Sequence, residues 1–209
     1  MFFKMNVLKK MIKAAYNARD LILGHHEIVN EEDGTIETEG WVIVGGWWSI
    51  YIDRWTTTKE LKAALIEVAG ELPYNNHYFR VLPEGNQEMV EAGPCVNPID
   101  LFAKCKSDVN VSKLAAVFQT SAVRLLQNCE SDEVTCIREL GYELIDKTAV
   151  DYDNGEYEPI GPRTSEDDIM CWGNNVCFLA IWPYKLLDEE KEHDKSMFLK
   201  ELSKIALPS

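Results

Sequence analysis

The stretch WVIVGGWWSIYID, residues 41–53, constrains the fold of this chain more than any other. Two runs of apolar, β-branched and aromatic residues flank Gly45 and Gly46. Such residues are typical of strands, and two adjacent glycines can supply the positive φ angles of a tight hairpin turn. We therefore predict an antiparallel hairpin around Gly45-Gly46, within a small sheet.

Amphipathic segments on both sides of this hairpin predict helices that pack on the sheet. The segment 56–72, for example, begins with threonines suited to a helix cap and continues with good helix formers. The expected helices are residues 1–24, 56–72, 99–106, 129–140 and 186–207, and the other strands are 142–152 and 174–182. The segment 25–40 is polar and turn-rich, and 153–168 is expected as a loop or a partly mobile arm. The predicted class is α+β, with a core over 1–128 and an acidic strand-and-helix extension over 129–209.

Residues 111–127, VSKLAAVFQTSAVRLLQ, have the pattern of two short helices joined by a tight turn. We predict a helix-turn-helix-like pair over 110–128, a unit whose second helix enters the major groove in many DNA-binding proteins. In this alternative, a DNA-binding regulator, the contacts would come from Lys104, Lys106, Lys113, Arg124 and Gln127. A scaffold role is favoured over DNA reading, because any packed helix pair would show the same apolar residues.

The order of elements over residues 45–128 resembles that of the ImmA/IrrE-type zinc peptidases of bacteria and their mobile elements. The best match is to a Leu-Ala-x-x-Phe-x-x-Ser pattern, at Leu114, Ala115, Phe118 and Ser121. The resemblance implies a helix bearing HExxH where this chain reads IEVAG. Glu67 takes the place of the acid/base glutamate, but Ile66 and Gly70 replace the two histidines and cannot bind zinc. The resemblance therefore implies at most a pseudo-enzyme.

Other signatures of catalysis are missing from the sequence, which contains no GxSxG, GxxxxGK[ST] or GxGxxG motif. The six cysteines lack zinc-knuckle spacing, so we expect free thiols and neither a metal nor a cofactor. His25 and His26 are expected at a helix end, as a cap and a surface group. An enzyme with a dispersed site stays open, and a pocket gathering Glu67, His77 and a cysteine would favour it.

Neither a membrane span nor a secretory signal is expected. No apolar run approaches the roughly 20 residues that cross a bilayer, and lysines interrupt the first 24 residues. These features predict a cytoplasmic protein without membrane contact.

Charge is spread unevenly along the chain, whose formal net charge is -14. Residues 25–100 carry -10 and residues 129–209 carry -11, whereas residues 1–24 carry +4 and residues 101–128 carry +3. Carboxylates can occupy cations that otherwise bind phosphate, and they speed association with basic partners. The acidic segments therefore favour a basic protein or nucleoprotein complex as partner, with DNA a partner only in the regulator alternative.

The leading hypothesis is a non-catalytic acidic binding protein. It would be an inhibitor or antidote of phage or mobile-element origin that blocks a basic nucleic-acid-handling enzyme, such as a defence enzyme. The expected partner-binding carboxylates are Glu31, Glu32, Asp33, Glu37, Glu39, Asp151, Asp153, Glu156, Glu158, Glu166, Asp167 and Asp168. Tryptophans at 47, 48, 55 and 172 are either interface anchors or core residues. The oligomeric state stays open.

Overall fold

The computed structural model describes residues 1–29, 32, 35–83, 86–91, 97–149, 152–154, 156–165 and 167–209. The helices are α1 (Met5–Ala18), α2 (Lys59–Ala69), α3 (Pro98–Ala103), α4 (Glu139–Glu143), the 3-10 helix η2 (Tyr152–Asn154) and α5 (Glu189–Leu202). The strands are β1 (Ile22–Val29), β2 (Ile36–Gly45), β3 (Trp48–Asp53), β4 (Tyr78–Val81), β5 (Gln87–Val90), β6 (Ser107–Phe118), β7 (Ser121–Asn128), β8 (Val134–Arg138), β9 (Ile160–Thr164), β10 (Met170–Gly173) and β11 (Cys177–Ile181). None of these helices combines the length and the apolar character that crossing a membrane requires.

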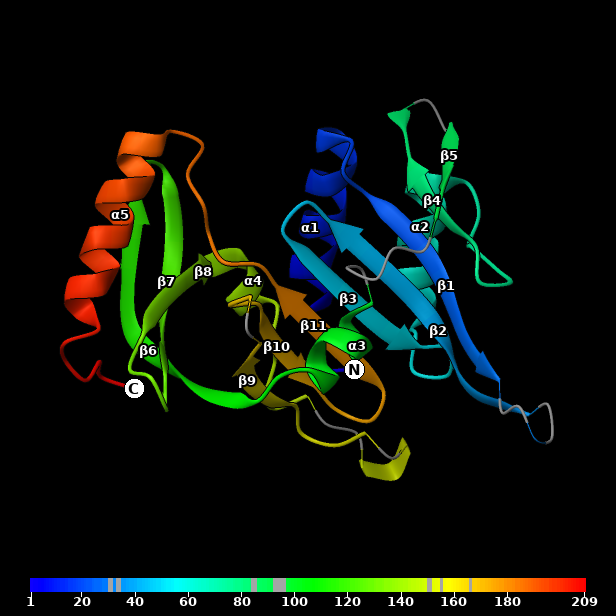
Figure 1. The fold of residues 1–209 in the computed structure, drawn as a ribbon. Helices are drawn as coiled ribbons and strands as arrows, with labels where there is room; N and C mark the ends of the chain where they lie inside the picture. Colours follow the sequence, from blue (N-terminus) through cyan, green and yellow to red (C-terminus); the bar gives the residue numbers. More distant parts are fainter. Residues whose placement is uncertain are drawn as a thin grey trace.

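The strands form one open sheet in the order β5-β4-β1-β2-β3-β11-β10-β9-β6-β7-β8 (Figure 1). Every pair of neighbours is antiparallel. The predicted α+β class with an antiparallel sheet is confirmed, but the prediction of a small sheet is wrong, because eleven strands take part. Strands β9 to β11, which follow residue 128 in the sequence, lie between β3 and β6, which precede it. Both predicted regions therefore contribute strands to one sheet. The expected boundary at residue 128 stays a prediction.

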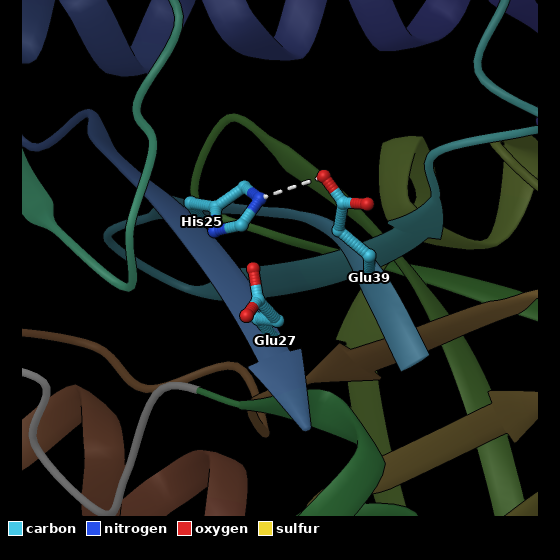
Figure 2. A group of neighbouring side chains, drawn as sticks. All are labelled: His25, Glu27 and Glu39. Atoms are coloured by element: carbon cyan, nitrogen blue, oxygen red, sulfur yellow. Dashed lines mark hydrogen bonds and ion pairs between the residues drawn. The ribbon is translucent and has the colours of Figure 1, made fainter. Parts of the chain in front are cut away.

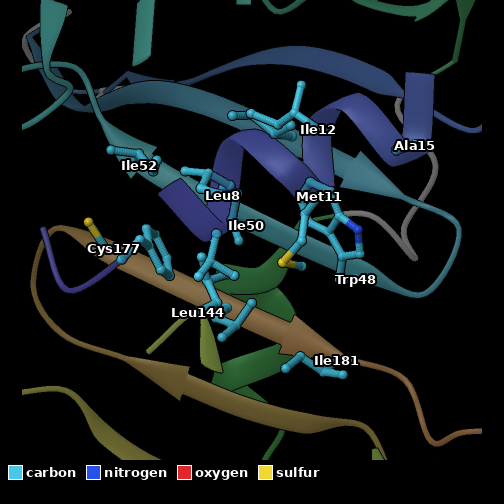
Figure 3. Packing of buried hydrophobic residues seen from close by; sticks show 14 of the residues in the cluster. Leu8, Met11, Ile12, Ala15, Trp48, Ile50, Ile52, Leu144, Cys177 and Ile181 are labelled. Atoms are coloured by element: carbon cyan, nitrogen blue, oxygen red, sulfur yellow. The ribbon is translucent and has the colours of Figure 1, made fainter. Parts of the chain in front are cut away.

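One face of the sheet is covered by α1 and α2, and the main core lies beneath them. Leu8, Met11 and Ile12 recur at helical spacing on α1 and are almost fully buried. They pack toward Trp48 and Ile50 of β3 (Figure 3). Burying one such side chain stabilises the fold by roughly 1.5–3 kcal/mol, so this layer anchors the N-terminal helix that the sequence predicts.

The opposite face of the sheet packs against α3 at strands β10 and β11. Cys171 of β10 and Ala180 of β11 belong to one buried cluster with Leu101 of α3, whereas the alternate residues Trp172 and Leu179 belong to the main core. This alternation follows from the two-residue period of a strand. Both faces of β10 and β11 are therefore buried, which explains why their sequence is apolar without interruption.

The far end of the sheet is covered by α5, as the predicted closing helix. Val123 and Leu125 of β7 pack with Tyr184 and with Leu199 of α5. The helix begins at a side-chain cap, since Asp188 accepts a hydrogen bond from the Lys191 amide at 3.1 Å.

The predicted helix-turn-helix-like pair over 110–128 is wrong. These residues form the β6–β7 hairpin, in which Phe118 pairs with Ser121 and Gln119 takes a positive φ of 55° in the turn. A short apolar run is ambiguous between a helix and a buried strand. Here the ambiguity is resolved by β8 and β9, which flank the hairpin in the sheet and come from later in the chain.

Other local predictions have mixed outcomes. The hairpin in 41–53 is confirmed, but its turn is Gly46-Trp47, and neither Gly45 nor Gly46 has a positive φ. The helix in 56–72 is confirmed, with Thr58 as its cap. The expected helix 129–140 is instead β8 followed by α4, and the described residues of 142–152 form no strand. The turn-rich segment 25–40 contains most of β1 and part of β2. The segment 153–168, expected as a loop or a partly mobile arm, contains β9.

Candidate functional site

Strands β1 and β2 extend beyond their neighbours in the sheet as a two-stranded arm, of which residues 27–29, 32 and 35–39 are described. On the outer side of β1, β4 pairs only with residues 22–24. On the outer side of β2, β3 pairs only from Gly40 onward. Figure 1 shows the arm projecting past the ends of β3 and β4. We call residues 27–39 the acidic arm, because they include six acidic residues and no lysine or arginine.

The acidic arm carries five of the carboxylates that the sequence predicts to bind a partner. Glu32 and Glu37 are exposed, and Glu39 lies at the base of the arm with only 15% of its side chain exposed. Glu31 and Asp33 lie outside the described residues. The exposed carboxylates therefore belong to the projecting part of the arm, and Glu39 has a different environment.

Apolar side chains accompany these carboxylates. Val29 and Ile36 are paired across the arm and are 42% and 54% exposed. Residues directly opposite each other in an antiparallel pair lie on the same face, so the two form one apolar spot. Trp55, beside the base of the arm, is 85% exposed, and the Arg54 guanidinium lies 5.5 Å from the centre of its ring.

The base of the arm is held by a network around Glu39 (Figure 2). One Arg54 nitrogen donates to both oxygens of Glu39 at 2.7 Å, and His25 Nε2 lies 3.2 Å from Oε1. The hydrogen bonds from Arg54, together with the bond to His25, hold the pKa of Glu39 below its ordinary value, although burial opposes them. Glu39 is therefore ionised at neutral pH and joins β1, β2 and the segment after β3.

His25 is buried within β1, which corrects the expectation of a cap at a helix end. The backbone N–H of Asn76 donates a hydrogen bond to Nδ1 of His25 at 3.3 Å. The proton of the neutral ring therefore sits on Nε2, from which it is donated to Glu39. His26, the next residue, is half-buried, and its Nε2 lies 3.2 Å from the Asn97 amide nitrogen.

Donor atoms of His25, Glu27 and Glu39 lie within 4.8 Å of one another, which is close enough to consider a metal ion (Figure 2). Both nitrogens of His25 are already hydrogen-bonded, however. A metal at Nε2 would require the ring proton on Nδ1, facing the amide hydrogen of Asn76. The geometry therefore favours a structural ion-pair network over a metal centre.

The second predicted acidic group, in 151–168, is divided among three environments. Asp153 and Glu158 are exposed, whereas Glu156 is buried against the amino group of Met1. Asp167 and Asp168 are exposed in the turn between β9 and β10. The pKa of Asp168 is raised by partial burial and by the nearby carboxylates of Glu133 and Asp167. Asp151 and Glu166 lie outside the described residues.

A cleft of about 1060 Å³ opens where the β2–β3 turn, the end of β8 and the segment after β11 meet. Two backbone hydrogen bonds join these parts: Trp182 donates to Trp47 at 3.0 Å, and Tyr184 donates to Cys136 at 2.8 Å. The sequence had singled out Trp47 but neither Arg138 nor Lys185, which also line the cleft. Glu67, His77 and the described cysteines are not among its lining residues.

The residues predicted to contact DNA do not form one surface. Lys104 and Lys106 line the cleft, and Lys113 is exposed on β6. Arg124 donates through Nε and a terminal nitrogen to the two oxygens of Glu139. Gln127 is buried, and its side chain hydrogen-bonds the backbone of Asp132, Ile205 and Leu207. Arg124 and Gln127 thus have structural partners.

Comparisons with models of known protein families, with curated proteins and with solved structures found no match. On α2, Ile66 and Glu67 are exposed, and Gly70 ends the helix. The helix pair on which the resemblance to zinc peptidases chiefly depends is the β6–β7 hairpin. The family therefore stays a prediction.

Proposed function

We propose that this chain is a non-catalytic binding protein that docks onto a basic macromolecule through the acidic arm. The observation that carries the proposal is the arm itself, a projecting ribbon whose described residues, 27–29, 32 and 35–39, include four acidic and no basic ones. A cluster of one charge sign on a projecting element focuses the electrostatic potential there and steers a partner of opposite sign toward it.

The composition of the arm supports docking, because exposed carboxylates and exposed apolar residues occur together on it. Val29 and Ile36 supply exposed apolar surface, and Glu32 and Glu37 are exposed nearby. Protein interfaces combine an apolar centre with a polar rim, and tryptophan is enriched among the residues that dominate binding energy. Trp55 is suited to such an anchor, since it is 85% exposed beside the base of the arm.

The strand edges of the arm support the same proposal. Beyond β3 and β4, no described strand pairs with the outer edges of the ribbon, although at its base Asn76 hydrogen-bonds the backbone of Glu27 and the Arg54 N–H donates to the Glu39 carbonyl oxygen at 2.8 Å. A two-stranded ribbon is only marginally stable alone, and its open edges can pair with a strand of another chain. The network at Glu39 orients the base of the ribbon. Less conformational entropy is therefore lost when the partner binds.

In this proposal the protein acts as an inhibitor of a nucleic-acid-handling protein. The arm carboxylates occupy the lysines and arginines with which the partner would bind phosphate, and thereby exclude nucleic acid. The chain supplies no bond-making chemistry in this mode of action, and its effect depends on affinity alone.

The test compares capture of partners from a host-cell extract by three forms of the protein. The arm variant replaces Glu31, Glu32 and Glu37 with glutamine. The control variant, Glu189→Gln with Glu190→Gln and Asp194→Asn, removes three charges from exposed positions of α5. We expect a basic protein to be retained by the wild type and the control and lost by the arm variant. Equal retention by all three forms would contradict the proposal.

A further inference from the structure

The described lining of the cleft is net positive, in contrast to the chain as a whole. Its described lining includes four cationic side chains but only two acidic ones, Asp20 and Asp167, in a chain of net charge -14. The cations are Lys104, Lys106, Arg138 and Lys185. They come from the segment after α3, the end of β8 and the segment after β11, so the fold gathers them from distant parts of the sequence.

Arg138 is held in place by aromatic rings. Its guanidinium carbon lies 5.4 Å from the ring centre of Trp47 and 4.9 Å from that of Tyr184. Stacking of this kind holds the planar group while leaving its N–H edges available. No carboxylate among the described residues forms an ion pair or hydrogen bond with this guanidinium. A half-buried arginine oriented in this way matches the paired oxygens of a phosphate.

The cleft also contains an aromatic surface suited to a planar group. Trp182 is half-buried, packs against the cluster beneath α3, and lines the cleft. Planar rings stack on tryptophan with little dependence on their exact identity. The volume of about 1060 Å³ is slightly above the usual range for small-molecule sites, which runs from roughly 300 to 1,000 Å³, so a nucleotide fits within it.

We propose that this cleft binds a nucleotide. The phosphates contact Arg138, with Lys104 and Lys185 adding positive charge at the mouth, and the base lies against Trp182. The local cations offset the negative field of the surrounding protein. This site is separate from the acidic arm, and it does not depend on the function proposed for the arm.

The test is titration of the full chain with ATP, adenosine and pyrophosphate, followed by calorimetry and by tryptophan fluorescence. We expect ATP to bind and to change the fluorescence. Adenosine should bind about tenfold more weakly or worse, because it lacks the charge-assisted contacts to phosphate. Pyrophosphate should also bind more weakly than ATP, because it lacks the stacked base. Pyrophosphate binding as tight as that of ATP would overturn the nucleotide assignment, and so would the absence of any ATP binding.

Two variants locate the binding in the cleft. Lys104→Glu with Lys185→Glu changes exposed residues, and should weaken ATP binding about tenfold or more while leaving the unfolding transition unchanged. Lys113→Glu with Lys200→Glu makes the same charge change at exposed positions outside the cleft lining and should bind ATP almost as the wild type does. Equal weakening in both variants would mean a general field effect and would overturn the site.

Arg138→Lys tests the stacked arginine separately. The lysine keeps the charge but not the planar fork, so ATP binding should weaken severalfold while the weak binding of adenosine stays the same. Near-ultraviolet circular dichroism checks that the surrounding aromatic residues keep their packing. Unchanged ATP binding in a correctly folded Arg138→Lys protein would contradict the proposed phosphate contact.

Discussion

Replacing Arg124 by alanine should destabilise the fold, because this side chain joins three parts of the sheet region. Its Nε donates to Glu139 Oε2 at 2.9 Å, and a second nitrogen donates to Oε1. Its third nitrogen lies 3.2 Å from the Ser112 carbonyl oxygen and 3.4 Å from that of Lys113. The guanidinium also lies 5.1 Å from the ring centre of Tyr142. This arrangement assigns Arg124 a structural role.

The magnitude follows from the burial of the pair. Both Arg124 and Glu139 have 19% of their side chains exposed, so water can replace only part of the lost contacts. Breaking a fully buried pair costs about 3–5 kcal/mol, and an exposed pair contributes about 0–1 kcal/mol. We therefore expect Arg124→Ala to lower the free energy of unfolding by roughly 2–3 kcal/mol, with a coupling energy to Glu139 of about 1–3 kcal/mol in a double-mutant cycle.

Urea denaturation of wild type, both single variants and the double variant measures these energies. Arg163→Ala is the matched control, since its pair with Asp108 is more exposed at 36% and 73% and should contribute no more than about 1 kcal/mol. Duplex DNA binding is measured in the same samples at low salt. An Arg124→Ala protein with wild-type stability, or one whose main loss is DNA affinity, would refute the reasoning.

Three further predictions concern the network, the pH dependence and the core. Glu39→Ala should cost about 1–3 kcal/mol in urea denaturation, because it leaves the buried Nε2–H of His25 without an acceptor, while Glu39→Gln should cost less; equal costs would contradict the network. Burial, opposed by Asp100 and aided by His25, lowers the pKa of His26 below 6.5. As the pH falls, His26 is therefore protonated in the unfolded chain before it is protonated in the folded protein. The free energy of unfolding should decline below pH 6.5, by up to about 1.4 kcal/mol per pH unit. A His26→Asn variant with the same pH dependence of the free energy of unfolding would contradict the assignment to His26. Ile12→Ala should cost about 2–5 kcal/mol by calorimetry or urea, since Ile12 is 1% exposed in the main core, and a loss under 1 kcal/mol would question the packing of α1.

The elements that the sequence predicts well are those whose signals are local. The helix α2 begins at Thr58, whose hydroxyl accepts from the Leu61 amide, and such a cap can be recognised from the sequence alone. The same holds for α1, whose apolar face follows helical spacing, and for the hairpin of β2 and β3. In each case the residues that determine the structure are neighbours in the chain.

The errors arise where distant strands decide the structure. The β6–β7 hairpin was predicted as helices, because nothing within residues 107–128 reveals that β8 and β9 lie beside it. The same limit applies to the sites. The acidic arm is contiguous in sequence and was predicted as a charge cluster, although its β-ribbon form was not. The cleft is assembled from segments far apart, so Arg138 and Lys185 gave no signal.

The central claim, that the acidic arm docks on a basic partner, is tested most directly by zero-length cross-linking of carboxylates to lysines in the captured complex. We predict that the cross-linked peptides of this chain map to residues 27–39, and that the arm variant loses them while the α5 control variant keeps them. Cross-links that map to α5 or to the β9–β10 turn, with none on the arm, would contradict the account.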